Sequence, residues 1–230
     1  MTSDKLTVAG EATDTSPNPD LLKRASEAVQ MAVRAGQLAP TFRLQGAGGE
    51  TYSLLVLIEK APLLITFYRG LWCDYCQARL ESLAELYPQI RALAAQQVVI
   101  GPAARNDAEM AWLAALPMPV LLDRDLRITA AYGMSIDLPE DLHGRYTGLG
   151  YLPVANDRWV VPVPGTLLVE PTGRVAMAAA DADYRSQVAA ADLLAALRGL
   201  QKRRLSAIAQ HPINPESPGE SDASQASLGT

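Results

Sequence analysis

Leu63-Leu-Ile-Thr-Phe-Tyr-Arg-Gly-Leu-Trp-Cys-Asp-Tyr-Cys76 is the stretch that decides how this chain folds. It opens with an apolar run typical of an inner strand and ends with the only two cysteines of the chain, Cys73 and Cys76. When such a strand leads into a helix, both sulfurs lie on one face of the first turn, where helical N–H groups favour the thiolate. The spacing therefore predicts a thiol redox site at the start of a helix.

The composition is that of a globular protein with one sizeable core. The chain has 230 residues, of which 49% are hydrophobic and 20% charged, and its net charge is −5. Because an acidic chain offers no broad basic face, we expect neither nucleic acid nor an anionic membrane as a partner. No segment has the length of a membrane span, and the N-terminus lacks the apolar core of a signal peptide. We therefore expect a cytoplasmic protein.

In a reducing compartment, two close cysteines are more often catalytic or metal-binding than a structural crosslink. A zinc site needs two further ligands. The only histidines, His143 and His211, lie in an irregular region and in the C-terminal tail. We therefore expect no metal and no cofactor, and a catalytic role for the pair.

The two ends of the chain differ in composition from its middle. Residues 1–18 and 206–230 are polar and rich in Ser, and we expect both to be disordered tails. Residues 19–37 predict a helical extension, in which Asp20 caps the helix and Gly36 ends it. Residues 38–205 then predict one domain, on which the extension docks.

Within this domain the pattern alternates between strands and helices. Strands are expected at 38–44, 51–54, 63–68, 97–101, 119–122, 165–170 and 174–178. Helices are expected at 73–96, kinked by Pro88, and at 107–116, 127–132 and 186–200. Short links between them favour a sheet flanked by helices and joined by right-handed crossovers, an α/β fold. Residues 134–161 have no clear period and predict an irregular insertion that borders the site.

Several segments taken in this order carry a family resemblance. They are Ala39-Pro-Thr-Phe-Arg-Leu44, Phe67-Tyr-Arg-Gly-Leu-Trp-Cys-Asp-Tyr-Cys76, Pro119-Val-Leu-Leu-Asp123, Val161-Pro-Val-Pro-Gly-Thr166 and Asp183-Tyr-Arg185. Over roughly residues 38–200 the chain resembles peroxiredoxin-like proteins of the alkyl hydroperoxide reductase/thiol-specific antioxidant (AhpC/TSA) family. The resemblance implies a thioredoxin-like fold, with a central mixed sheet, an N-terminal hairpin and antioxidant thiol chemistry.

The resemblance also suggests residues that contact substrate. Pro164 corresponds to the cis-proline that faces the cysteine pair in thioredoxin-like proteins, and the backbone of Val163 before it would offer hydrogen-bonding groups. Arg69, Trp72 and Tyr75 surround the pair in sequence and are further candidates. For Trp72, a place in the core wall is an equally good interpretation.

Two reaction cycles fit a Cys-x-x-Cys pair at this position. In a disulfide reductase, Cys73 attacks a substrate disulfide and Cys76 resolves the mixed disulfide. In a peroxidase, a thiolate attacks a hydroperoxide, becomes a sulfenic acid and condenses with the other cysteine. A thioredoxin-type or glutathione-type thiol would return the electrons. The rival hypothesis is a binding module that uses the pair as a redox switch without turnover.

The peroxiredoxin and thioredoxin comparisons assign the attack to different sulfurs. Counted from Phe67, Cys76 stands where peroxiredoxins carry their peroxidatic cysteine, whereas thioredoxin-like logic makes a more exposed Cys73 the nucleophile, which we favour. The peroxiredoxin signature Pro-x-x-x-Thr-x-x-Cys is absent, and Pro164 replaces the arginine that polarises peroxide. Arg69 or Arg185 could take over that role.

Two other positions depart from thioredoxins. Thr66 replaces their buried aspartate, and Asp74 between the sulfurs opposes a thiolate if its carboxylate points toward them. Association of the chain with itself as a homo-oligomer is a further hypothesis about its partners.

Overall fold

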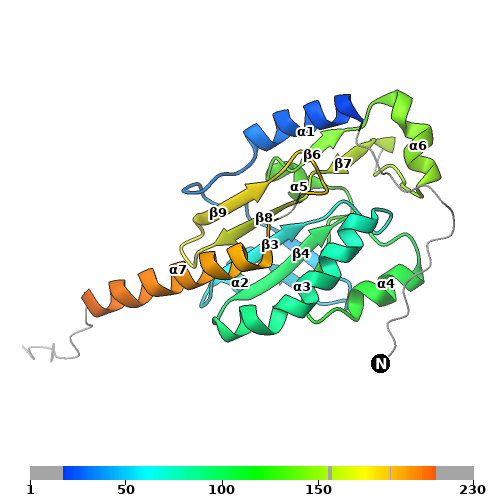
Figure 1. Ribbon diagram of the computed structural model, residues 1–230. Coiled ribbons are helices and arrows are strands. Elements are labelled where there is room, and N and C mark those ends of the chain that lie inside the picture. The colour runs from blue at the N-terminus through cyan, green and yellow to red at the C-terminus, as the bar shows by residue number, and fades with distance from the viewer. Residues whose placement is uncertain (1–17, 155–156, 187, 211–230) are drawn as a thin grey trace, which may run out of the picture.

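A seven-stranded mixed sheet with helices on both faces forms the centre of the computed structural model, which describes residues 18–154, 157–186 and 188–210 (Figure 1). Its strands are β1 (Arg43–Gly46), β2 (Thr51–Ser53), β3 (Leu63–Phe67), β4 (Gln96–Gly101), β5 (Val120–Leu122), β8 (Gly165–Val169) and β9 (Val175–Ala180). A second sheet pairs β6 (Ser135–Asp137) with β7 (Val160–Pro162). The helices are α1 (Pro19–Met31), α2 (Leu54–Ile58), α3 (Asp74–Ala92), α4 (Asp107–Ala114), α5 (Arg127–Ala131), α6 (His143–Gly148) and α7 (Ala190–Gln210), with one 3-10 turn, η1 (Glu140–Leu142). The predicted α/β class with a central mixed sheet is confirmed.

The strand order puts β3 inside the main sheet. The order is β2-β1-β5-β4-β3-β8-β9, with β4 parallel to both β3 and β5 and the other pairs antiparallel. Every residue of β3 is buried, as expected for an apolar strand covered on both faces. The cysteine segment therefore leaves the sheet from an inner strand and not from an edge.

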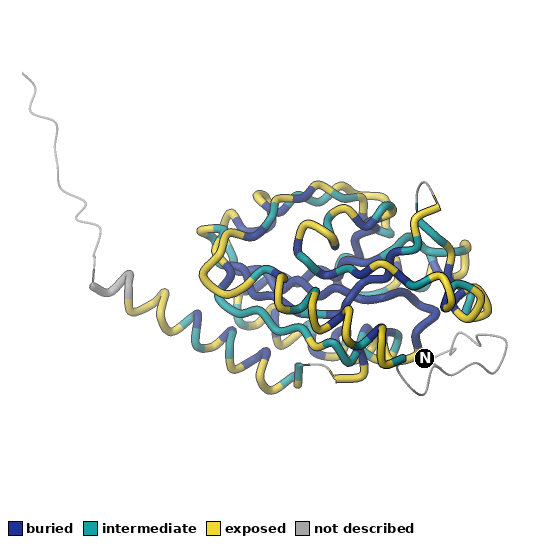
Figure 2. Tube along the Cα trace, turned by 90° about the horizontal axis from the view of Figure 1, so that it is seen from above, coloured by how far each residue is buried: buried dark blue, intermediate teal, exposed yellow. Residues whose placement is uncertain are grey.

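Successive side chains of β3 enter two separate hydrophobic layers, because neighbours on a strand point to opposite faces. Leu64 belongs to the layer formed with Leu83 of α3, Leu113 of α4 and Leu193 of α7. Ile65 belongs to the layer formed with Leu54 and Leu57 of α2. Figure 2 shows the buried segments gathered in the central strands, with exposed residues along the outer faces of the helices.

The N-terminal helix begins and ends at other residues than predicted. Asn18, and not Asp20, caps it: its side-chain oxygen accepts hydrogen bonds from the backbone N–H groups of Asp20 (2.9 Å) and Leu21 (3.2 Å). The helix ends at Met31, and Gly36, with φ of +90°, belongs to a later turn. Leu21 is buried in the layer under α3, so the predicted docking of α1 is confirmed.

Residues 134–161 are more regular than predicted. β6 and β7 pair as an antiparallel ribbon, and η1 and α6 lie between them in sequence (Figure 1). The strands have three residues each and α6 has six, so neither a strand nor a helix period can develop in the sequence. β6 contacts α1, and the insertion thus extends the face on which α1 docks.

Two further helices differ from the predictions. The strand expected to run through Leu54 ends at Ser53, and the all-apolar residues that follow form α2; a short apolar run does not distinguish strand from helix. α7 begins at Ala190 instead of Ser186 and continues to Gln210, so the predicted domain end at 205 falls inside a helix. Residues 1–17 and 211–230, where tails were predicted, lie outside the described residues.

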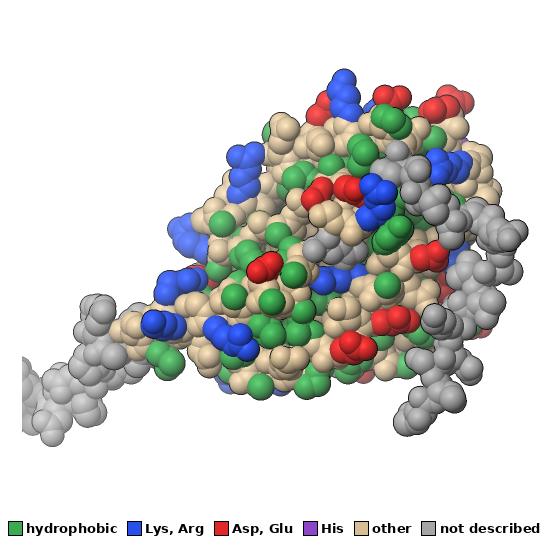
Figure 3. All heavy atoms as spheres, in the orientation of Figure 1, with side chains coloured by type: hydrophobic (Ala, Val, Ile, Leu, Met, Phe, Trp, Pro, Cys, Tyr) green, Lys and Arg blue, Asp and Glu red, His purple; other side chains and the backbone are tan. Residues whose placement is uncertain are grey.

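The outer half of α7 projects beyond the sheet in Figures 1 and 2. Figure 3 shows basic side chains along this projection, which carries Arg198, Lys202, Arg203 and Arg204. None of the helices in the described parts of the chain is long and apolar enough to cross a membrane.

The strand predicted at 38–44 begins only at Arg43, and Leu38 forms an isolated bridge to Arg174. The other predicted elements are confirmed with small shifts. α3 contains Pro88, as predicted, and continues past it to Ala92. The hairpin of β8 and β9 turns at Gly173, whose φ of +79° is the left-handed conformation that the turn requires. α3 is the element that carries the cysteines, so its packing decides how firmly they are held.

The packing of α3 is tested by Leu83→Ala. Leu83 is fully buried, and its truncation leaves a cavity under α3, so we expect a loss of about 2–5 kcal/mol in the free energy of unfolding. Urea denaturation measures it. The matched control is Leu205→Ala on the exposed side of α7, which is expected to change stability by less than about 0.5 kcal/mol. Equal effects of the two substitutions would contradict the packing described.

Candidate functional site

The cysteines lie where β3 passes into α3. Cys73 is the N-cap residue of α3 with an extended backbone, and Cys76 is in its first turn, where its N–H donates to the carbonyl of Cys73 (2.9 Å). Gly70 makes the connection with φ of +138°, and a Cβ there would lie 2.4 Å from the indole nitrogen of Trp72. The loop therefore needs glycine here, because any side chain would collide with Trp72.

A side-chain hydrogen bond from Cys76 to Cys73 is the largest influence on the pKa values of both thiols. This bond, with help from the Arg69 charge and against the effect of burial, lowers the pKa of Cys73 to about 7. The same bond, together with burial, raises the pKa of Cys76 well above its usual range. Of the two thiols, Cys73 is therefore the one that loses its proton more readily.

Both sulfurs are less accessible than predicted. Cys73 is 5% exposed and Cys76 is 1% exposed, so Cys73 is not the open nucleophile that thioredoxin-like logic suggests. Both are free thiols and both belong to the hydrophobic layer under α3. The same layer contains Tyr146 and Tyr151 of the 134–161 insertion and Tyr184 of the segment before α7, which no local pattern near the cysteines predicts.

Arg69 is the buried cation of the site. It is 2% exposed, its backbone N–H donates to the sulfur of Cys76 (3.4 Å), and one guanidinium nitrogen donates to the hydroxyl of Tyr146 (2.8 Å). No carboxylate pairs with it within the described ranges. Burial acts to lower the pKa of Arg69, but Tyr146, the two cysteines and Tyr184 outweigh it and raise the pKa. Arg69 therefore stays charged beside the thiols.

Aromatic rings take the place of a counter-ion around this guanidinium. Its central carbon lies 4.0 Å from the ring centre of Tyr184, 4.8 Å from that of Trp72 and 6.0 Å from that of Tyr146. Faces of aromatic rings attract a cation, more strongly when both are desolvated. The second terminal nitrogen of Arg69, Nη1, has no hydrogen-bond partner among the described residues. This buried donor points to an acceptor that the apo chain does not supply.

Tyr146 and Tyr184 were missed by the sequence analysis as site residues. They come from α6 and from the link between β9 and α7, far from the cysteines in sequence. The only sequence signals were the aromatic residues of the insertion and the Asp183-Tyr-Arg185 motif. Neither signal says that the rings meet at Arg69, because that depends on how the insertion folds back.

The candidates that flank the cysteines in sequence divide into buried and exposed residues. Trp72 is a core wall at 7% exposure, packed edge-on against Tyr146 and Tyr151. Tyr75 is 42% exposed and meets Tyr184 edge-on, with ring centres 5.7 Å apart. Asp74 is exposed at the start of α3.

The expected cis peptide at Pro164 is wrong, since the described residues contain none. Val163 is buried, and its N–H donates to the carbonyl of Met134 (2.7 Å), so this group is already used within the chain. The α1 residues Leu21 and Leu22 face Arg69 and the segment between β7 and β8 that contains Val163 and Pro164, across a gap of about 20 Å³. The backbone that would receive a partner chain is therefore covered by α1.

Arg185 does not reach the cysteines. It is exposed and forms an ion pair with Asp183 (2.7 Å). Its pairing lowers the pKa of Asp183 and leaves Arg69 as the arginine at the sulfurs.

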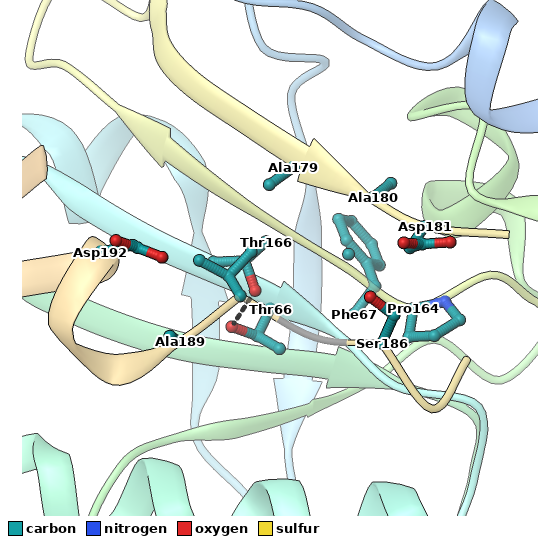
Figure 4. A pocket seen from close by; sticks show the side chains of 12 residues that line it. Thr66, Phe67, Pro164, Thr166, Ala179, Ala180, Asp181, Ser186, Ala189 and Asp192 are labelled. Atoms are coloured by element: carbon teal, nitrogen blue, oxygen red, sulfur yellow. Dashed lines mark hydrogen bonds between the residues drawn. The ribbon is translucent and has the colours of Figure 1, made fainter. Parts of the chain in front are cut away.

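A cavity of about 370 Å³ lies beside the site, between the ends of β8 and β9 and the start of α7 (Figure 4). On its floor the hydroxyls of Thr66 and Thr166 lie 3.2 Å apart, both buried. Asp181 and Asp192 stand at its two ends in Figure 4. Neither cysteine lines this cavity, so its size alone does not make it the reaction site.

In the described parts of the chain, no three His, Cys, Asp or Glu side chains are placed to hold a metal.

Comparison with known proteins assigns the family. The model of the AhpC/TSA family matches residues 35–178. The chain belongs to the AhpC/TSA family. It is therefore a thiol oxidoreductase of the peroxiredoxin type, and the resemblance drawn from the sequence is confirmed. The match ends before α7 and begins after α1, so both helices are additions to the matched region. No curated protein matches the chain.

Solved structures agree on the thioredoxin-like fold. Peroxidoxin BcpB from Mycobacterium tuberculosis has 20% sequence identity and a TM-score of 0.57, with 73% of this chain and 98% of that chain covered. Peroxiredoxin Q from Xanthomonas campestris has 19% identity and a TM-score of 0.55, with 73% and 99% covered. AhpC from M. tuberculosis has 17% identity and a TM-score of 0.55, with 76% and 96% covered. At these identities the likeness shows the fold.

The hydrogen bond between the thiols makes a prediction about pH. Since the pKa of Cys73 is lowered to about 7, its thiolate is present above that pH and is lost as the pH falls through it. In Cys76→Ala the donor is gone, so the pKa should rise toward the ordinary cysteine value of about 8.5. Thiolate ultraviolet absorbance against pH measures both.

Cys76→Ser is the matched control, because the serine hydroxyl still offers a donor. Its Cys73 should titrate closer to the wild-type value than that of Cys76→Ala. If both variants titrate like wild type, the thiol pair does not set the pKa.

Proposed function

We propose that this protein reduces small hydroperoxides, with Cys73 as the attacking thiolate and Cys76 as the resolving thiol. The observation that carries the proposal is the arrangement of Cys73, Cys76 and Arg69: a thiolate that accepts a hydrogen bond from its resolving partner, next to a buried guanidinium without a carboxylate. AhpC/TSA membership supports peroxide as the substrate. The experiment below distinguishes a hydroperoxide from a disulfide as the substrate that oxidises the thiols.

The proposed cycle balances with a hydroperoxide and two reducing thiols. The Cys73 thiolate attacks one peroxide oxygen, the O–O bond breaks, and the leaving alkoxide or hydroxide takes a proton and departs as an alcohol or water. Cys73 is then a sulfenic acid. Cys76 attacks its sulfur, water leaves, and the Cys73–Cys76 disulfide forms. Two thiols of a thioredoxin-type or glutathione-type donor reduce this disulfide and become oxidised themselves.

Burial of the pair favours a small oxidant over a protein disulfide. A folded partner would have to reach cysteines that are only 5% and 1% exposed. A hydroperoxide of few atoms needs a much smaller opening. The gap of about 20 Å³ next to Arg69 is roughly the room that one water needs. For the same reason, reduction of the buried disulfide requires local opening before the donor thiol can attack.

Arg69 supplies the electrostatic part of the proposal. Its charge acts on the Cys73 thiolate, from which negative charge would pass to the departing oxygen, and its Nη1 donor has no hydrogen-bond partner among the described residues. Preorganised donors in a water-poor site stabilise such charge strongly. Trp72, Tyr146 and Tyr184 hold the guanidinium in place. Val163 and Pro164 stay candidates for substrate contact only after α1 has moved.

The substrate is tested by NADPH consumption coupled through a thioredoxin or glutathione system. Hydrogen peroxide, a small organic hydroperoxide and a protein disulfide are compared on wild type, Cys73→Ser and Cys76→Ser. We expect turnover with both peroxides, little with the protein disulfide, and none in either variant. In Cys76→Ser, one equivalent of peroxide should leave a sulfenic acid on Cys73 that a trapping reagent labels.

Three results would count against the proposal. Turnover with the disulfide alone would make the protein a reductase. A sulfenic acid on Cys76 in Cys73→Ser, with none on Cys73 in Cys76→Ser, would reverse the roles. Reversible oxidation without turnover by any donor would favour a redox switch.

Homo-oligomer formation and a cytoplasmic location stay predictions.

The role of Arg69 is tested by Arg69→Met, with Arg185→Gln as the matched control. Methionine fills similar apolar space, and replacing a buried charge by an apolar side chain often preserves the fold. We expect the reaction of Cys73 with hydrogen peroxide to slow by about a hundredfold in Arg69→Met, because one preorganised donor and its charge are lost. The exposed Arg185→Gln should react like wild type. The reverse pattern in stopped-flow kinetics would assign the role to Arg185.

A further inference from the structure

A second cavity, of about 190 Å³, lies behind Trp72 at the carboxyl ends of the three parallel strands. Gly70 follows β3, Pro102 follows β4 and Arg124 follows β5, and all three line it. In α/β sheets, ligands bind in the crevice outside the carboxyl ends of parallel strands. Neither cysteine lines this cavity, so it is separate from the dithiol.

The walls of the cavity are largely apolar and aromatic. The residues that form them are Tyr68, Leu71, Trp72, Pro102, Leu113, Tyr151, Leu152 and Pro153. Trp72 and Tyr151 stand edge to face, with ring centres 5.7 Å apart. Leu152 is 63% exposed, so apolar surface continues to the mouth. Such walls suit a compact apolar or planar body.

One buried donor in the wall has no acceptor. The indole nitrogen of Trp72, a residue that is 7% exposed, has no hydrogen-bond partner among the described residues. This nitrogen lies against Gly70. A Cβ at Gly70 would also lie near Pro102, and both Gly70 and Pro102 line the cavity. A buried N–H without a partner costs free energy, which an acceptor on a ligand would recover.

Of the two arginines that line the cavity, Arg105 and Arg124, only Arg124 is available to bind an anion. Arg105 forms an ion pair with the buried Glu109 and also donates to the carbonyls of Leu149 and Gly150, so its donors are occupied. Arg124 is exposed at the mouth and has no ion pair or hydrogen bond within the described residues. The cavity therefore presents one free positive charge, one orphaned N–H and apolar walls.

We propose that this cavity binds a small aromatic carboxylate, whose ring packs against Trp72 and Tyr151 and whose carboxylate meets Arg124, with an oxygen within reach of the Trp72 N–H. The volume of about 190 Å³ equals that of about six waters in the liquid, enough for a ring with a short carboxylate arm and too little for a long acyl chain. This binding does not depend on the redox cycle, because it uses neither sulfur.

The probe for the test is cinnamate, with its amide as the uncharged counterpart of the same shape. Isothermal titration calorimetry on the full chain measures both. We expect saturable binding of cinnamate, binding of the amide that is weaker by about fivefold, and a shift of the Trp72 indole N–H signal in nuclear magnetic resonance spectra on addition of cinnamate. Trp72→Phe identifies that signal among the three tryptophans.

Three variants separate the parts of the site. Arg124→Gln should weaken cinnamate binding by about fivefold and leave amide binding unchanged. Arg91→Gln removes an exposed charge at the far end of α3 and should bind cinnamate like wild type. Ala104→Phe fills the cavity from its wall and should abolish binding of both compounds, with circular dichroism showing that the fold persists. Absence of saturable binding, equal binding of acid and amide, or full binding by Ala104→Phe would each overturn the proposal.

Discussion

The site depends on one buried charge. Arg69 is removed from water beside two thiols, and burying an unpaired cation costs far more than a fold of this size can spare. Aromatic faces, one phenol and a thiolate share its stabilisation, since no carboxylate does so in the described chain. Reciprocally, the guanidinium favours the charged form of Cys73. The Arg69 cation and the Cys73 thiolate therefore stabilise each other.

This arrangement gives the insertion at 134–161 and the link before α7 a physical purpose. Each delivers a tyrosine to Arg69 from a different part of the chain, while β3 and the loop after it deliver Arg69 and Trp72. The paired strands β6 and β7 hold the insertion in place, and the N–H of Val163 is tied to the carbonyl of Met134 at its base. The tyrosines that meet Arg69 belong to the same hydrophobic layer as the two buried cysteines. Protection from water and restricted access are thus two results of one set of contacts.

α1 adds a further layer outside the region matched by the family. It lies against the segment between β7 and β8 that contains Val163 and Pro164, and only a gap of about 20 Å³ separates them. In the proposed cycle, a small oxidant and a larger reducing thiol would need openings of different size to reach the cysteines. In the proposed cycle, α1 and the link carrying Tyr184 are the elements that would have to open to admit the reducing thiol.

The sequence by itself determined the fold class and the place of the chemistry. The apolar run Leu63–Phe67, the cysteine pair and the alternation of strands and helices are local patterns, and local periodicity reports burial and element type directly. Tertiary structure decided what surrounds the pair. That Cys73 is buried, that Pro164 is trans and covered by α1, and that Tyr146 and Tyr184 enclose Arg69 all depend on contacts between segments distant in the sequence. Such contacts leave no period in a single chain, because the packing partner of a ring is set by the path of the backbone and not by the neighbours of that ring in sequence.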